Sequence, residues 1–153
     1  MVSVVGSSGK TVSVQIFGAA DLVRKLEATK LSVMAGLSRE LGRAGQFLAA
    51  EVQESIIGNR AEPKSVKTGL LANSITVDVS QIDNGVVTVK PDKQTYPGSG
   101  GVTTEDVAGF MEYGTSTTEP RRHFANSLDR NEEEIKERIQ ASVGNSVNIS
   151  FNH

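Results

Sequence analysis

Cysteine and tryptophan are absent from this chain, and aromatic residues make up only 5% of its 153 residues. Without cysteine there are no disulfides and no thiolate metal sites. With so few aromatics, the core must be built from Val, Ile, Leu and Ala. No apolar run approaches the roughly 20 residues that a membrane-spanning helix requires. The length fits one domain, residues 1–153, with a modest core.

The chain also lacks a large excess of charge of either sign. The chain carries 16 Lys and Arg against 18 Asp and Glu, a formal net charge of −2, and neither half is strongly basic. Proteins that hold nucleic acid or anionic membranes tightly concentrate Lys and Arg on one face. We therefore expect no membrane partner and no tight nucleic-acid binding.

The stretch "VVGSSGKT", residues 4–11, resembles a phosphate-binding loop but fails its pattern. In G-x-x-x-x-G-K-[ST] the first glycine would occupy position 4, where this chain has Val4. A helix must follow such a loop, because its first amides hold the phosphates. Here Val12, Val14 and Ile16 alternate with polar residues, which predicts a strand. We interpret residues 1–10 as a flexible arm or turn.

Two long helices are predicted from apolar residues that recur at three- and four-residue steps. The first ends at Gly58-Asn59, and glycines within it (Gly36, Gly42 and Gly45) suggest the close approach of another backbone, from a sheet or from a neighbouring subunit. The second begins at His123 or Phe124 and ends at Gly144-Asn145. A short helix capped by Asp21 is predicted before both. The apolar stripes are Met34, Leu37, Leu41, Ala44, Leu48, Val52 and Ile56, then Leu128, Ile135, Ile139 and Val143.

Strands account for the remaining apolar patterns. Alternation at Ile75, Val77 and Val79 and again at Val87 and Val89 flanks Asn84-Gly85, the signature of a tight hairpin. Residues 92–105 are rich in turn formers, so we expect a mobile loop. Residues 147–153 are interpreted as a terminal strand or tail. The order predicts an α+β fold: a small, mainly antiparallel sheet packed by two long helices plus a short N-terminal helix.

Groups for catalysis are sparse, so the sequence predicts a protein that is not an enzyme and has no catalytic, cofactor-binding or metal-binding residues. His123 and His153 belong to no recognisable motif, and we interpret His123 as a structural or contact residue. Glu132, Glu133 and Glu134 are consecutive on a helix and cannot converge on one ion. Glu112 has no spaced carboxylate partner. These residues favour a protein that works by binding or assembling.

Three segments in a fixed order carry a resemblance: "TGLLANSI" (residues 68–75), "FMEYGT" (110–115) and "EPRRHFANSL" (119–128). They resemble a family of tail-completion proteins, the minor tail or head–tail joining components of long-tailed bacteriophages. That family has Thr-Gly-x-Leu-x-x-Ser-Ile before the first sheet strand, then Glu-[Tyr/Phe]-Gly-Thr, then a Pro-Arg-Pro-Phe-like segment that opens the last helix. The family usually has Pro where this chain has His123. The resemblance covers roughly residues 11 to 143.

The resemblance implies a structural virion protein that assembles in the host cytoplasm as a ring, expected to be a hexamer, at the head-proximal end of the tail. Its partners would be further copies of itself, the tail-tube protein and a head-completion or neck protein. Residues expected at the subunit or neck and tail interface are Glu112, Tyr113, Thr115, Arg121 and Arg122. Residues expected to define the fold are Thr68, Gly69, Leu71, Ile75, Gly114, Pro120 and Phe124.

Two other functions stay open from sequence. One is a small nucleotide- or phosphate-binding protein that uses residues 6–11, and the other is a monomeric adaptor module. Affinity for ATP would favour the first. A mass that stays monomeric at all concentrations would favour the second.

Overall fold

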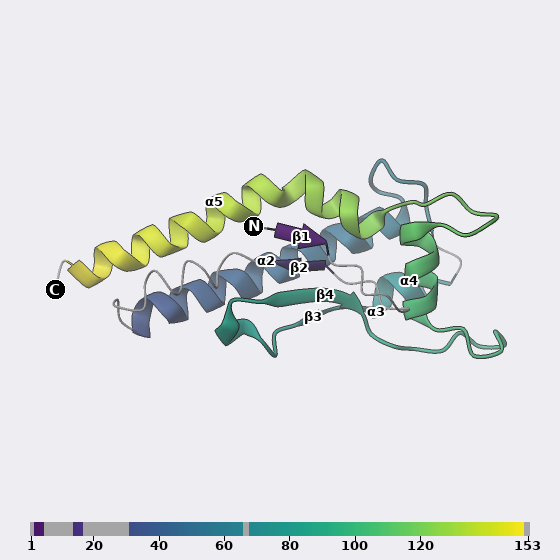
Figure 1. Ribbon diagram of the computed structural model, residues 1–153, viewed down its shortest axis with the longest axis horizontal. Helices are drawn as coiled ribbons and strands as arrows, with labels where there is room; N and C mark the ends of the chain where they lie inside the picture. Colours follow the sequence, from purple (N-terminus) through teal and green to yellow (C-terminus); the bar gives the residue numbers. More distant parts are fainter. Residues whose placement is uncertain (1, 5–13, 17–30, 66–67, 152–153) are drawn as a thin grey trace.

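The computed structural model describes residues 2–4, 14–16, 31–65 and 68–151 (Figure 1). The fold is α+β, as predicted, with two long helices laid over a small antiparallel sheet. The expected short helix after Asp21 and the glycine-rich residues 6–11 lie outside the described residues. Residues 2–4, which belong to the segment predicted as a flexible arm or turn, form a strand.

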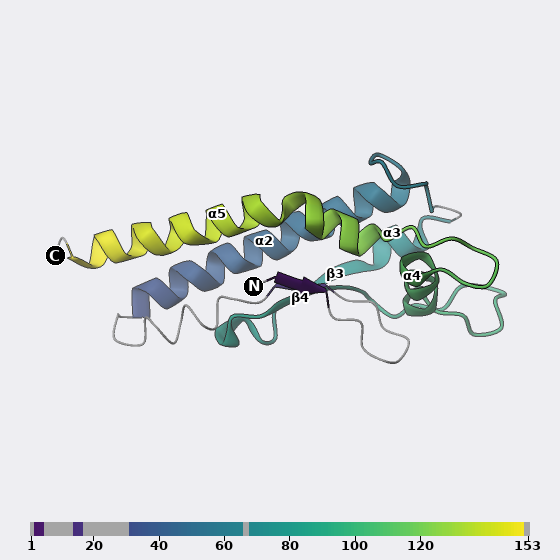
Figure 2. The same cartoon turned by 45° about the horizontal axis from the view of Figure 1, so that its top comes forward.

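The two long helices, α2 (Leu31–Ile57) and α5 (His123–Phe151), run antiparallel along each other for most of the molecule (Figures 1 and 2). The predicted stripe of α2 is buried from Leu37 to Ile56, and on α5 Leu128 and Ile135 are buried against it. The 3.6-residue period of the sequence therefore identified the contact faces of both helices correctly.

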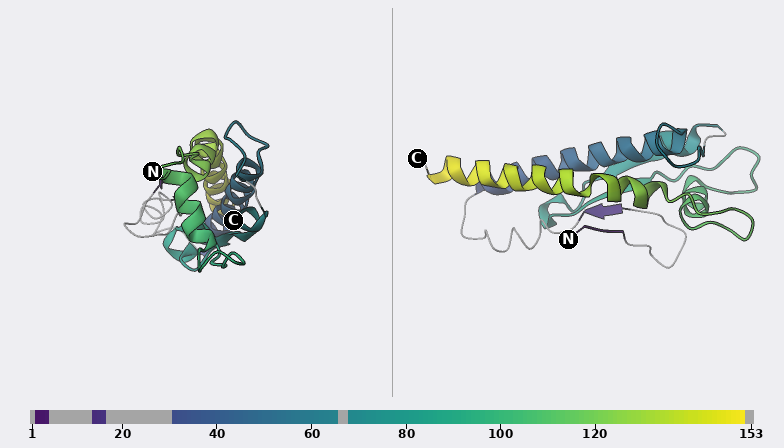
Figure 3. Two further views of the ribbon diagram at one scale, coloured as in Figure 1. Left: turned by 90° about the vertical axis from the view of Figure 1, so that its right-hand side faces the viewer. Right: turned by 90° about the horizontal axis from the view of Figure 1, so that it is seen from above.

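The sheet has the strand order β1-β2-β4-β3, with every neighbouring pair antiparallel. α2 packs on β3 and β4, while α5 contacts β2 (Figure 3). Gly45 lies where α2 crosses the sheet. A Cβ built on it would lie 2.5 Å from Val87 Cγ1 and 2.8 Å from Val77 Cγ1, so only glycine lets the helix sit this close. The strands are β1 (Val2–Val4), β2 (Val14–Ile16), β3 (Ile75–Asp78) and β4 (Val87–Pro91).

The hairpin of β3 and β4 is confirmed, but its predicted tight turn at Asn84-Gly85 is wrong. A short 3-10 helix, η1 (Ile82–Asn84), fills the connection, and of the two turn residues only Gly85 has a positive φ, of 73°. The Gly85 amide donates to the Ile82 carbonyl at 2.9 Å. The side chain of Ile82 packs against the core, and this burial favours the longer turn.

The predicted terminal strand is wrong at residues 147–151, because α5 continues through Gly144-Asn145 to Phe151. A glycine inside a helix costs only about 1 kcal/mol relative to alanine. Contacts with α2 on the other side offset that cost: Val143 is buried, and Ser142 Oγ donates to the Gly36 carbonyl at 3.3 Å.

Two short helices connect the sheet to the rest of the fold. α3 (Leu70–Ser74) precedes β3, and α4 (Thr104–Tyr113) follows the loop after β4. α4 begins with a capping box, in which Thr103 Oγ1 accepts from the Asp106 amide and the Asp106 carboxylate accepts from the Thr103 amide. Residues 104 and 105, assigned to a loop from sequence, belong to this helix.

Residues 92–103 form a closed loop with its own hydrogen bonds. Thr95 and Thr103 pair as an antiparallel bridge, and the Tyr96 amide donates to the Val102 carbonyl at 2.9 Å. Ser99 Oγ lies within hydrogen-bond distance of the Tyr96 carbonyl, at 2.7 Å, and of the Val102 carbonyl, at 3.2 Å. Its predicted mobility stays a prediction. This loop, α4 and the loops 58–65 and 114–122 gather at one end of the molecule (Figures 1 and 3).

Candidate functional site

The corner between α4 and α5 depends on Gly114. Its φ of 77° and ψ of 178° are accessible almost only to glycine, and a Cβ there would lie 2.7 Å from the Thr118 carbonyl oxygen and 3.0 Å from Pro120 Cδ. The Thr115 amide donates to the Thr118 carbonyl at 2.8 Å, which closes the turn. The fold role expected for Gly114 and Pro120 agrees with this geometry.

Glu112 does not lie on the surface, where an interface residue would have to lie. It is 3% exposed, and its carboxylate accepts the backbone amides of Phe124 at 3.0 Å and Ala125 at 2.9 Å. These are among the first amides of α5, which have no partner within their own helix. Burial raises the pKa of the Glu112 carboxyl, against the lowering effect of the two amides. Glu112 therefore caps α5 from the neighbouring helix.

Arg121 also turns toward its own chain. Its Nη1 donates to the Lys64 carbonyl and, at 2.8 Å, to Ser65 Oγ. Its backbone amide donates to the Met111 carbonyl at 2.7 Å and so helps to end α4. Arg121 thus links the 58–65 loop to the start of α5. From sequence it was expected at an interface, and this contact was not predicted.

The other expected interface residues lie at the surface. Tyr113 is 57% exposed, and Thr115 and Arg122 are exposed on the loop that follows. Arg122 has a φ of 52°, a left-handed conformation that is uncommon for residues other than glycine. Phe110, 45% exposed and three residues before Tyr113, lies on the same side of α4 but was not singled out from sequence. Its place inside "FMEYGT" was the available signal.

Three of the residues expected to define the fold lie in the core. Leu71, Ile75 and Phe124 are buried members of the main apolar cluster. Gly69 starts α3 with a φ of 78°. Thr68 is exposed, and its Oγ1 accepts the Leu70 amide at 3.3 Å, which supports the first turn of α3.

His123 lies at the centre of a buried polar cluster. It is 1% exposed, and its two ring nitrogens contact serine hydroxyls from different segments: Nδ1 lies 2.8 Å from Ser55 Oγ on α2, and Nε2 lies 2.6 Å from Ser65 Oγ. Ser55 Oγ in turn donates to Glu62 Oε2 at 2.8 Å, and Arg130 on α5 pairs with the other oxygen of Glu62. We call Glu62, Ser55, His123 and Ser65 the buried relay.

The ionised carboxylate of Glu62 determines which group donates and which accepts in each hydrogen bond of the buried relay. An ionised carboxylate only accepts, so Ser55 gives its single hydroxyl proton to Glu62. His123 Nδ1 must then be the protonated nitrogen and donate to Ser55. This leaves Nε2 bare, so that it accepts the hydroxyl proton of Ser65. The tautomer of a buried histidine is therefore set by a carboxylate that it does not touch.

The pKa values of the relay keep this arrangement in place at neutral pH. Burial lowers the pKa of His123 to about 4, reinforced by the positive charges of Arg121 and Arg130 and opposed by Glu62. For Glu62, burial acts to raise the pKa, but hydrogen bonds from Ser55 and Arg130 outweigh it and lower the pKa to about 2. His123 is thus neutral and Glu62 ionised near pH 7.

Sequence reasoning missed this cluster because His123 lies 58 residues beyond Ser65 and the other members share no motif with it. Ser55 lies in a helix, Glu62 and Ser65 in a polar loop, and His123 at the start of another helix. Only the packing of α5 on α2 brings them together. His123, interpreted from sequence as a structural or contact residue, has buried partners that the sequence did not reveal.

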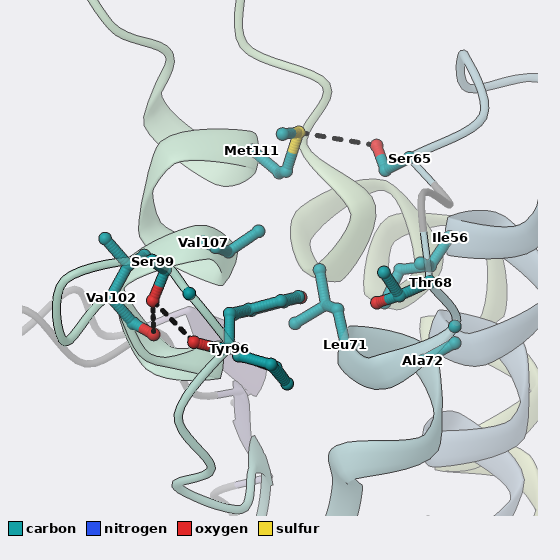
Figure 4. A pocket seen from close by; sticks show the side chains of 13 residues that line it. Ile56, Ser65, Thr68, Leu71, Ala72, Tyr96, Ser99, Val102, Val107 and Met111 are labelled. Atoms are coloured by element: carbon teal, nitrogen blue, oxygen red, sulfur yellow. Dashed lines mark hydrogen bonds between the residues drawn. The ribbon is translucent and has the colours of Figure 1, made fainter.

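A cavity of about 460 Å³ opens beside Ser65 (Figure 4). Its walls come from α3, the 92–103 loop and α4, and its lining is mainly apolar, with Leu71, Tyr96, Val107 and Met111 prominent. Ser65 and Thr68 contribute hydroxyl groups at one side. The volume falls within the range of small-molecule sites.

Among the residues that the structure describes, no group of three or more His, Asp or Glu side chains could hold a metal ion. Within that same part of the chain, every helix is too short or too polar to cross a membrane.

Comparisons of this chain with protein-family models, with curated proteins and with solved structures found no match.

Proposed function

We propose that the chain is a structural virion protein, a tail-completion or head–tail joining component that assembles as a ring at the head-proximal end of a phage tail. The observation that carries this proposal is the exposed aromatic pair Phe110 and Tyr113 within the segment that resembles the tail-completion family. Exposed apolar groups that lie together are a common feature of interaction sites.

The surroundings of the pair suit an interface. Thr115 and Arg122 lie on the loop directly after it, where they provide a polar rim. Tyrosine offers apolar area with a hydrogen-bonding tip, which makes it frequent among residues that dominate binding energy. We call Phe110, Tyr113, Thr115 and Arg122 the α4 surface.

Assembly would join the α4 surface of one copy to a different surface of the next, and such a head-to-tail contact closes into a ring when its rotation allows. Further copies, the tail-tube protein and a neck protein are the proposed partners. The proposed location is the tail or neck of the virion, after assembly in the host cytoplasm.

The test is the assembly state of the purified chain, followed by sedimentation over a range of concentrations and by electron microscopy for rings. Tyr113→Asp and Phe110→Asp should prevent rings and leave the urea midpoint nearly unchanged, because exposed substitutions rarely shift stability by more than about 0.5 kcal/mol. Val79→Asp is the matched control, since Val79 is an apolar residue with 46% exposure outside the α4 surface.

Rings that survive both aspartates, or that Val79→Asp disrupts equally, would contradict the role of the α4 surface. A complementation assay in a phage that encodes the chain tests the location: without it, tails should fail to join heads. Measurable ATP affinity that Lys10→Ala abolishes would favour the nucleotide-binding alternative instead.

A further inference from the structure

Ser65 is the point at which the buried relay meets the cavity. Its Oγ lies 2.6 Å from His123 Nε2, and its residue lines the cavity wall. An assembly role uses neither the cavity nor the direction of this hydrogen bond. The same hydroxyl also lies 3.4 Å from Met111 Sδ, but a thioether sulfur is a weak acceptor and the unprotonated Nε2 is a stronger one. A serine hydroxyl that donates to a neutral imidazole is the arrangement that activates a serine for attack.

We propose that Ser65 is a nucleophile that accepts an acyl group from an uncharged ester bound in the cavity. His123 is its general base, and Ser55 with Glu62 are positioning residues that hold the imidazole in the required tautomer. This inference goes beyond the proposed assembly role and does not depend on it.

The ester and the described residues supply every atom and proton of the acyl transfer. Ser65 Oγ attacks the carbonyl carbon, and its proton passes to His123 Nε2. The tetrahedral intermediate collapses, the bond from the carbonyl carbon to the alcohol oxygen breaks, and His123 returns the proton to the departing alcohol. The product is an acyl ester on Ser65, with a neutral His123 restored.

Arg121 places a positive charge beside the attacking oxygen. Its Nη1 lies 2.8 Å from Ser65 Oγ, so the guanidinium stabilises the oxygen as its proton leaves. Arg130 is held by Glu62 and keeps that carboxylate ionised. Arg121 is thus a fixed charge beside the reacting hydroxyl and Arg130 a fixed charge beside Glu62, and neither must move during the step.

The lining sets the chemical class of the acyl group. Leu71, Val107 and Met111 offer apolar walls, and Tyr96 closes one side (Figure 4). A volume of about 460 Å³ holds a short aliphatic chain, and the lining residues that the structure describes include no Lys or Arg to pair with a charged one. Esters of short, uncharged aliphatic acids therefore fit best.

The experiment uses p-nitrophenyl butyrate with the full chain. Nitrophenolate release should show a burst of one equivalent per chain, and intact-mass analysis with peptide mapping should place one butyryl group on Ser65. Ser65→Ala should lose the adduct, and His123→Gln should slow its formation by about 10²-fold or more, the usual contribution of a general base. Ser116→Ala, at an exposed serine, is the control and should react like the original chain.

Two further measurements distinguish a Ser65 hydroxyl that is activated by His123 from one that is only accessible to the ester. Ser55→Ala leaves Ser65 and His123 in place but removes the orienting contact, so acylation should slow while circular dichroism stays unchanged. The acid limb of the rate should fall near pH 4 instead of near 6.5, because burial, Arg121 and Arg130 keep His123 neutral against the opposing charge of Glu62.

The proposal is overturned if the adduct maps to other residues, if it forms equally in Ser65→Ala, or if folded His123→Gln or Ser55→Ala reacts at the original rate. The failure of these reactions would leave ring assembly untouched, so the two proposals are decided separately.

Discussion

The stability of the fold should fall between pH 7 and pH 5 because of His123. In the unfolded chain a histidine has a pKa near 6.5, whereas burial in the relay lowers the pKa of His123 to about 4. Between these values the unfolded chain binds a proton that the folded chain does not. Stability is therefore fully present above pH 6.5 and is lost as the pH falls toward 4.

The magnitude follows from the two pKa values. One pKa unit corresponds to about 1.4 kcal/mol, so the whole shift is worth about 3 kcal/mol, and about 2 kcal/mol of it should be lost by pH 5. For a domain of this size a loss of 2 kcal/mol lowers the urea midpoint by about 1 M. Glu62 loses its contribution only below pH 4.5, as the pH falls toward its pKa of about 2.

The assay is urea unfolding at steps from pH 7.5 to 5, for the original chain and for His123→Gln. Other groups, including Glu112 with its raised pKa and opposite sign, titrate in both chains, so the difference between the two pH dependences isolates His123. Equal pH dependences, or a histidine resonance of His123 that titrates near 6.5, would refute the buried neutral imidazole.

Three further substitutions test the corner between α4 and α5 by the same unfolding measurement. Gly114→Ala should destabilise by about 2 kcal/mol or more, since a Cβ would lie 2.7 Å from the Thr118 carbonyl at a φ of 77°; an unchanged midpoint would contradict the strain argument. Glu112→Ala should cost about 2 to 4 kcal/mol, because it leaves two amides of α5 unpaired, whereas Glu119→Ala at an exposed position should be neutral. Arg122→Gly should stabilise by up to about 1 kcal/mol through relief of its left-handed backbone, and a loss of stability there would mean that the side chain holds the fold.

Periodicity in the sequence predicted the parts of the fold whose burial is local. The apolar stripe of α2 has a regular 3.6-residue period because one side of the helix is buried along most of its length, and the alternation around residues 75–89 marks strands with one buried face. The end of α5 was predicted wrongly, because the pattern Val147, Ile149 and Phe151 and the glycine before it gave stronger local signals than the distant contact with α2.

The expected interface residues fall into two groups, those at the surface and those whose charge is used within the fold. Tyr113, Thr115 and Arg122 lie at the surface, as an interface requires, but Glu112 and Arg121 carry charge that the fold itself uses. The sequence does not distinguish a charged residue that is exposed to solvent from one that contacts a partner or pairs with a free helix amide. Only the position of the start of α5 beside α4 decides among these, and that position depends on the turn at Gly114.

By itself the sequence determined the class of fold, the faces of the two long helices and the hairpin, because those follow from the order of apolar and polar residues along short stretches. It also carries the three segments that resemble the tail-completion family. Tertiary structure alone decided which polar groups share an interior. The buried relay is drawn from three separate segments, with the members Ser55, Glu62, Ser65 and His123. The apolar period of the sequence does not predict that the first residue of α5 lies beside the end of α2. The proton arrangement of the relay, and the cavity at its end, exist only after that packing forms.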